Sequence, residues 1–89
     1  MRLLKASKKT KVSSLTQAIA ADLQAKQAVQ VRAIGKEAAA VMVYAVASLQ
    51  GAFFEQAPKT DVIWQHISTP EKGETSMIMM TVYPPTKTN

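Results

Sequence analysis

Apolar residues recur along the chain with two different periods, and together these periods predict alternating helices and strands. One apolar stripe with a spacing of four residues predicts a helix of roughly 12 residues that fades near Lys26. Its members are Leu15, Ile19 and Leu23, with Ala18 and Ala21 beside them. Ser14 followed by Gln17 has the spacing of a capping box, so we expect this helix to begin near Ser14.

Strand patterns precede and follow this helix. Residues 28–34 alternate apolar and polar positions for part of their length, as a half-buried strand does. We expect three further strands, over residues 2–7, 61–68 and 75–83. A polar loop at residues 69–74 would join the last two strands as a hairpin, and Pro84-Pro85 would end the final strand.

A second helix is predicted over residues 36–50, and it is apolar on nearly every side. Gly51 follows it, at the place where a left-handed residue often ends a helix. Such a helix needs cover on more than one face, and we expect the second cover to be another subunit. The run Met77-Ile78-Met79-Met80 similarly indicates apolar side chains on both sheet faces; a soft binding surface is the alternative to strand core.

The order strand–helix–strand–helix–strand–strand predicts an α+β fold. We expect a two-layer βαβαββ sandwich, with two helices on one face of a four-stranded mixed sheet. The length of 89 residues suits one domain, so we expect a single domain over residues 1–85 and a short C-terminal tail over residues 86–89. The longest apolar stretch, about ten residues, falls short of the ~20 that span a bilayer. The apolar run at residues 1–5 is too short for a signal peptide, so we expect no targeting segment there.

The charged residues, which sum to a net charge of +5, are unevenly distributed along the chain. The first 36 residues hold eight basic residues and one acidic residue, whereas the remainder holds three basic and five acidic residues. A basic half can attract nucleic acid, anionic lipid or an acidic protein; the alternative is a solubilising surface. The absence of cysteine excludes disulfides and thiolate metal sites and favours a cytoplasmic protein.

Residues suited to catalysis are scarce. The chain has one histidine, His66, beside Trp64 in a predicted strand, and six scattered carboxylates. The segment Arg32–Lys36 contains one glycine, which does not make a phosphate-binding loop. We therefore predict a non-enzymatic protein with no catalytic residues, no metal, no cofactor, no small-molecule substrate and no membrane partner.

The segment Ser7-Lys8-Lys9-Thr10-Lys11 is the strongest candidate for a binding site. Its lysines precede a helix N-terminus, where backbone N–H groups and the helix dipole favour an anion. Mobile lysines can contact a phosphodiester backbone without discriminating sequence, and few aromatic residues are present for base stacking. A solvated lysine loop with no ligand is the alternative.

Several of these segments, taken in order, resemble one family. They are Leu4-Lys5-Ala6-Ser7, the helix beginning near Ser14, Val31-Arg32-Ala33-Ile34-Gly35 with its alanine-rich helix, and the terminal hairpin. Together they resemble stage V sporulation protein S, in register from about Leu3 to Pro84. The resemblance implies an Alba-like fold, a role in regulating sporulation and related developmental events, and nucleic-acid binding by similarity to the Alba chromatin proteins.

The resemblance also implies roles for particular residues. Alba-type proteins bind nucleic acid with lysines of the first strand–helix loop and dimerise around their second helix. The implied nucleic-acid-binding residues are Lys8, Lys9 and Lys11, with Arg32 and Lys36 at the second strand–helix junction. The implied dimer interface consists of Val43, Val46, Ala47 and Leu49. One departure is the hairpin tip, Glu71-Lys72-Gly73-Glu74, which is short and net acidic where Alba proteins have a long basic arm.

Two functional hypotheses therefore stand at this point. The first is a homodimeric regulatory protein that binds DNA or RNA through the phosphate backbone. The second is a non-enzymatic protein–protein interaction or scaffold module, acting as a homo-oligomer in developmental regulation, whose charge serves solubility.

Overall fold

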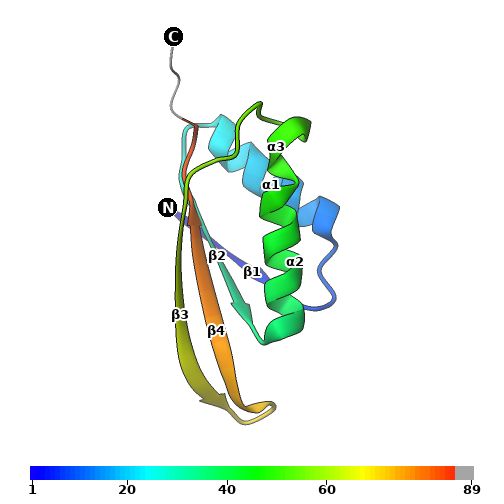
Figure 1. Cartoon of the computed structure of the whole chain (residues 1–89), viewed down its shortest axis with the longest axis vertical. Coiled ribbons are helices and arrows are strands. Elements are labelled where there is room, and N and C mark those ends of the chain that lie inside the picture. The colour runs from blue at the N-terminus through cyan, green and yellow to red at the C-terminus, as the bar shows by residue number, and fades with distance from the viewer. Residues whose placement is uncertain (86–89) are drawn as a thin grey trace.

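The computed structural model describes residues 1–85, and the predicted tail at residues 86–89 lies outside them. Within the described residues, four strands and three helices follow one another along the chain (Figure 1). Their bounds are β1 Arg2–Ala6, α1 Val12–Gln24, β2 Val29–Ile34, α2 Lys36–Ala47, α3 Leu49–Ala52, β3 Thr60–Thr69 and β4 Gly73–Val82.

The four strands form one mixed sheet in the order β1-β2-β4-β3. β1 pairs with β2 in parallel, while β4 pairs antiparallel with both β2 and β3. α1 and α2 lie on one face of the sheet, over β1, β2 and part of β4 (Figure 1). The predicted α+β sandwich is confirmed, with the short α3 as an addition.

β2 supplies the middle of the core because its side chains alternate between the two sheet faces. Val29, Val31 and Ala33 are buried beneath the helices, whereas Arg32 and Ile34 lie half-buried on the other face. The remaining large, fully buried side chains come from the three helices and from β4. They are Ile19, Leu23, Met42, Leu49 and Val82.

α1 buries the predicted stripe but begins earlier than expected. Leu15, Ile19 and Leu23 are buried, as the spacing of four residues predicted. The helix starts at Val12, its N-cap residue is Lys11, and no side chain caps it. The predicted capping box at Ser14 is therefore wrong. The physical reason is the preceding turn, which has already reversed the chain direction before Lys11.

α2 ends three residues before the predicted position. Ser48 closes it by donating its hydroxyl hydrogen to the carbonyl of Tyr44 at 2.8 Å. The chain then bends into α3, where Gln50 departs from helical geometry and Gly51 has the positive φ of 89° that glycine permits. Leu49 comes just before this bend, continues the buried side of α2 at the spacing of Met42 and Ala45, and is fully buried.

One polar contact joins the two long helices through the core. The Thr16 hydroxyl lies 2.8 Å from the carbonyl oxygen of Val12 and 3.0 Å from that of Ala45 on α2. Thr16 is 4% exposed, so water does not replace this bond when it is lost. The contact therefore fixes α1 and α2 relative to each other.

β3 and β4 form a hairpin longer than predicted, with ten residues in each strand. The connection shrinks to Pro70–Lys72, because pairing continues as far as Thr69 and Gly73. β3 is one of the two edge strands, and it is mostly exposed because the helices do not extend over it. The tip of the hairpin extends past the first turn of α2 (Figure 1).

The open end of this hairpin is closed by Tyr83. Its hydroxyl donates to Asp61 Oδ2 at 2.8 Å, and its backbone N–H donates to the carbonyl of Lys59. The hydrogen bond to Asp61, followed by desolvation and the negative charge of Asp61, raises the pKa of Tyr83 above its usual 10.0. The stabilisation that this hydrogen bond gives the folded state is thus fully present below the pKa of Tyr83 in the unfolded chain. It is lost as pH rises through the pKa of Tyr83 in the folded protein.

Replacing Thr16 by valine tests the contact between the helices. Thr16→Val keeps the shape and removes the hydroxyl, so we expect the free energy of unfolding to fall by about 1 kcal/mol. Ser48→Ala is the control, because it removes a similar hydroxyl-to-carbonyl bond at an exposed position. Guanidinium denaturation followed by circular dichroism measures both. Equal losses in the two variants would contradict a special role for the buried bond.

Candidate nucleic-acid interface

The β1–α1 loop is held in a fixed turn by its own hydroxyl groups. The backbone N–H of Ser7 donates to Thr10 Oγ1 at 3.0 Å, and the backbone N–H of Lys9 donates to Ser7 Oγ at 3.2 Å. The backbone N–H of Thr10 donates to the carbonyl of Ser7. Because the backbone polar groups face inward, the side chains of Lys8 and Lys9 are exposed.

This loop forms one wall of a cavity of ≈ 400 Å³ at the carboxyl ends of β1 and β2. Parallel strands end at the same edge of a sheet, so the loop after β1 and the junction after β2 lie side by side. The start of α2 and the tip of the β3–β4 hairpin complete the walls. The lining residues are Lys5, Ala6, Ser7, Lys8, Lys9, Arg32, Ile34, Ala38, Thr69, Glu71 and Lys72. We refer to this space as the cationic cavity.

The cationic cavity combines predicted and unpredicted charges. Lys8, Lys9 and Arg32 were predicted from the sequence, and the structure brings all three to it. Lys5 was missed, although it is the register partner of Arg32 in the parallel pair. Its signal was the alternation of β1, which places Lys5 on the opposite face from the buried Ala6, but only the pairing with β2 sets it beside Arg32.

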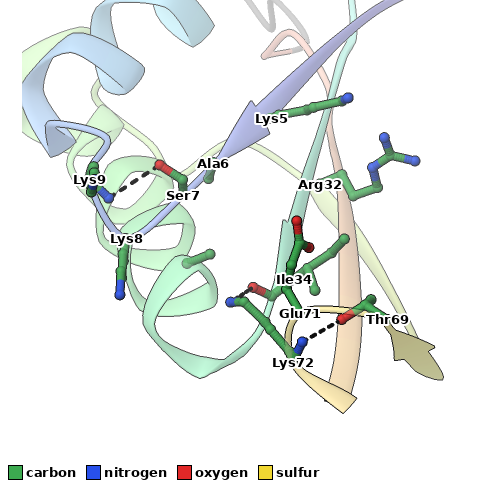
Figure 2. A pocket seen from close by; sticks show the side chains of 11 residues that line it. Lys5, Ala6, Ser7, Lys8, Lys9, Arg32, Ile34, Thr69, Glu71 and Lys72 are labelled. Atoms are coloured by element: carbon green, nitrogen blue, oxygen red, sulfur yellow. Dashed lines mark hydrogen bonds between the residues drawn. The ribbon is translucent and has the colours of Figure 1, made fainter. Parts of the chain in front are cut away.

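Lys72 is the second cation that sequence reasoning missed. Its Nζ donates to the carbonyl oxygen of Ile34 at 3.2 Å, and its backbone N–H donates to Thr69 Oγ1 at 3.0 Å (Figure 2). The hairpin tip thus bends toward the β2–α2 junction, despite its net acidic sequence. The contact joins residues 38 positions apart, and no local pattern in the sequence indicates it.

Gly35 makes room for this lysine at the junction between β2 and α2. A Cβ atom at this position would lie 2.8 Å from Lys72 Nζ. The backbone of Gly35 has φ 91° and ψ 161°, a conformation essentially restricted to glycine. Its N–H donates to the carbonyl of Ser76 at 2.9 Å, which fixes the junction against β4.

Two further predicted nucleic-acid-binding residues lie outside the cavity. Lys11 is the N-cap residue of α1, and Lys36 is the first residue of α2. Both side chains are exposed and neither lines the cationic cavity. The structure therefore brings together three of the five predicted residues and leaves these two at neighbouring helix starts.

The residues predicted for a dimer interface separate into two groups. Val43 is 49% exposed and Ala47 is also exposed, with Val46 half-buried next to them. Leu49, in contrast, is fully buried within the protein itself, so its side chain offers no surface to a partner. Tyr44, 66% exposed on the same helix, was not singled out from the sequence.

β3 also carries exposed apolar side chains. The register places Val62 opposite Met80 and Trp64 opposite Ile78, on the sheet face that carries the helices. Val62 is 41% exposed and Trp64 is 75% exposed. We refer to Val43, Tyr44, Val46, Ala47, Val62 and Trp64 as the apolar surface.

Groups suited to catalysis or metal binding do not converge in the part of the chain described. Residues 1–85 contain no cluster of three His, Cys, Asp or Glu side chains that could hold a metal ion. His66 is exposed, with Nε2 3.1 Å from Glu74 Oε1. Over the same range, no helix has the length and apolar character needed to cross a membrane.

Comparison with known proteins assigns the chain to a family. The family model for stage V sporulation protein S matches residues 2–83. The chain belongs to the stage V sporulation protein S family. This membership confirms the resemblance drawn from the sequence, over nearly the same residues.

Solved structures support the fold of this family member. Alba from Thermoplasma volcanium superposes with a TM-score of 0.62 at 15% sequence identity, covering 91% of this chain and 98% of the Alba chain. At that identity the similarity establishes an Alba-like fold and nothing more specific. A comparison with curated protein sequences finds no match.

Replacing Gly35 by alanine tests the junction that holds Lys72. We expect Gly35→Ala to lower the free energy of unfolding by ~1–3 kcal/mol, because alanine is strained at this φ and ψ. Gly51→Ala is the comparison variant, since Gly51 has a similar φ but a Cβ atom added there would meet no other atom within 4 Å. Chemical denaturation measures both.

A double-mutant cycle then separates the contact from the backbone strain. If the alanine Cβ also displaces Lys72, Gly35→Ala costs less stability in a Lys72→Ala background than in the wild type. An identical cost in both backgrounds would contradict the contribution of the Lys72 contact.

Proposed function

We propose that the protein is a non-enzymatic regulator that acts as a homodimer and binds DNA or RNA through backbone phosphates. The observation that carries the proposal is the cationic cavity, where five cations from β1, its loop, β2 and the hairpin tip meet at one edge of the sheet. Such a cluster attracts a polyanion, and lysine and arginine contacts to phosphate position a nucleic acid without selecting its sequence.

The surroundings of the cationic cavity favour phosphate over bases. Both α1 and α2 begin beside it, with Lys11 and Lys36 at their first turns. Helix N-termini add unpaired N–H groups and a partial positive charge. None of its lining residues is aromatic, so base stacking has no platform there.

The family and the sequence support the wider setting of the proposal. Membership in the stage V sporulation protein S family connects the chain to sporulation. The sequence contains no cysteine, which suits a reducing compartment, and we place the protein in the cytoplasm.

Binding through phosphates predicts a steep dependence on salt. With ~3–5 phosphates neutralised per dimer, the logarithm of the binding constant for duplex DNA or RNA falls with the logarithm of salt concentration at a slope near −3 to −4. Fluorescence anisotropy at a series of salt concentrations measures this slope. Absence of binding at low salt would overturn the proposal.

Matched charge variants locate the interface. We expect Lys8→Gln with Lys9→Gln to weaken binding strongly and to remove most of the salt dependence, since the change deletes four loop lysines from each dimer. Lys26→Gln with Lys59→Gln removes the same net charge from exposed positions outside the cationic cavity. Equal effects of the two pairs would mean that only net charge matters and would contradict a located interface.

The apolar surface supports the homodimer. Exposed clusters of large apolar side chains mark protein–protein interfaces, and here Tyr44, Val62 and Trp64 lie on the same side of the molecule as Val43. A second copy of the chain would cover the face of α2 that the sheet leaves open. Leu49 is not part of this proposed interface, because it belongs to the core.

A single charge at the centre of the apolar surface tests the dimer. Val43→Asp would bury an unpaired carboxylate between subunits, so we expect a shift from dimer to monomer of at least roughly tenfold in the dissociation constant. Light scattering over a range of concentrations measures it. Gln17→Asp, on the exposed side of α1, is the control. A wild-type monomer would overturn the dimer proposal.

The apolar surface also supports the second hypothesis, an interaction module that binds a different protein. In that case binding of the partner is lost with Val43→Asp and is insensitive to the Lys8 and Lys9 changes. The two sets of variants therefore discriminate the two functions.

A further inference from the structure

The cationic cavity is a partly open recess with walls on three sides. β1 and its loop bound one side, the end of β2 with the first turn of α2 bounds the second, and the hairpin tip bounds the third (Figure 2). The hydrogen bond from Lys72 Nζ to the carbonyl of Ile34 joins the third wall to the second. A strand of nucleic acid that enters from the open side meets the hairpin tip.

The charges in this recess are available to a ligand. Five cations and one carboxylate line it, and within residues 1–85 none of these six side chains forms an ion pair. A lysine ammonium has three N–H donors, of which Lys72 uses one for Ile34 in the structure. In Figure 2 Lys8 and Lys72 lie on one side of the Glu71 carboxylate, and the Arg32 and Lys5 side chains extend on its other side.

A recess of this charge suits the end of a strand better than its interior. An internal phosphodiester carries one negative charge, and its strand continues in both directions. A terminal phosphate monoester carries about −1.5 to −2 charges at neutral pH and offers three acceptor oxygens. It can therefore enter the recess and contact the lysines of the β1–α1 loop and of the hairpin tip, with charge-assisted hydrogen bonds that are stronger than neutral ones.

We propose that the cationic cavity binds the terminal phosphate of a nucleotide, either at the 5′ end of a strand or on a free nucleotide. The inference rests on the proposed function and makes its ligand more specific, since it predicts a preference for phosphorylated ends over internal duplex. The apolar walls at Ala6, Ile34 and Ala38 contact the sugar of that nucleotide. Lys72 supplies donors to its phosphate.

The negative charge of Glu71 lowers the affinity of the cavity for a phosphate. Its carboxylate points into the cavity between the side of Lys72 and the side of Arg32 (Figure 2). An incoming phosphate must approach this negative charge, which opposes its entry. Neutralising Glu71 without changing its shape therefore strengthens binding of the terminal phosphate.

The test compares two single-stranded oligonucleotides of one sequence, with a 5′-phosphate or a 5′-hydroxyl, by fluorescence anisotropy at low salt. We expect the phosphorylated strand to bind roughly tenfold more tightly, the effect of one or two charge-assisted hydrogen bonds. A nucleoside monophosphate and the matching nucleoside are then added as competitors. Displacement by the monophosphate alone assigns the cavity to free nucleotides as well; displacement by neither assigns it to strand ends.

Three variants locate the preference. Lys72→Gln lowers the ratio between the two affinities toward one, Glu71→Gln raises the affinity for the phosphorylated strand, and Lys59→Gln, outside the cavity, leaves the ratio unchanged. Chemical denaturation of each variant verifies that it is folded. A ratio that is the same in Lys72→Gln as in the wild type would remove the cavity as the site of the preference.

Closed circular duplex DNA, which has no ends, separates this inference from the proposed function. If the wild type binds it and also binds both oligonucleotides equally, the recognition of ends is wrong and phosphate-backbone binding stands. If none of the nucleic acids binds, both proposals are overturned.

Discussion

The parallel pairing of β1 with β2 is the constraint on which the candidate interface depends. A parallel pair ends at one edge of the sheet, so the lysine loop after β1 and the glycine junction after β2 are neighbours. Without that pairing, Lys8 and Arg32 would have no reason to face one cavity. The crossover helix α1 makes the pairing possible, and its buried stripe of Leu15, Ile19 and Leu23 secures it to the sheet.

The hairpin then adds a further wall to the cavity at this edge. Ten-residue strands carry its tip as far as the β2–α2 junction, where the Lys72 ammonium contacts the Ile34 carbonyl. Gly35 permits the approach because it has no side chain and tolerates a positive φ. A tip with net negative charge thereby contributes a cation to the cavity, together with one carboxylate at Glu71 that moderates it.

α2 takes part in both surfaces of the molecule. Its first turn lies at the cationic cavity, and its exposed side carries Val43 and Tyr44, while β3 presents Trp64 on the sheet face that carries the helices. A dimer formed through that side would hold two cationic cavities in one assembly. Under the proposed function, two such cavities on one nucleic acid would raise the effective concentration of the second contact.

The sequence by itself determined the elements and the local chemistry. Periodicity located both long helices and all four strands, and composition indicated a lysine loop suited to phosphate. These features depend on neighbouring residues, so their signals are local. Boundaries were less accurate: the turn at Ser7–Thr10 and the bend at Ser48 moved helix ends that capping patterns had misplaced.

Only the tertiary structure decided which charged and apolar groups meet. Lys5 acquires its role from its register with Arg32, and Lys72 from a contact across 38 positions, which no spacing in the sequence encodes. Leu49 differs from these two lysines, because it continues the local spacing of Met42 and Ala45 and is buried with them. Long-range strand pairing and packing decided the positions of Lys5 and Lys72, because these contacts form only once the sheet has brought distant segments together.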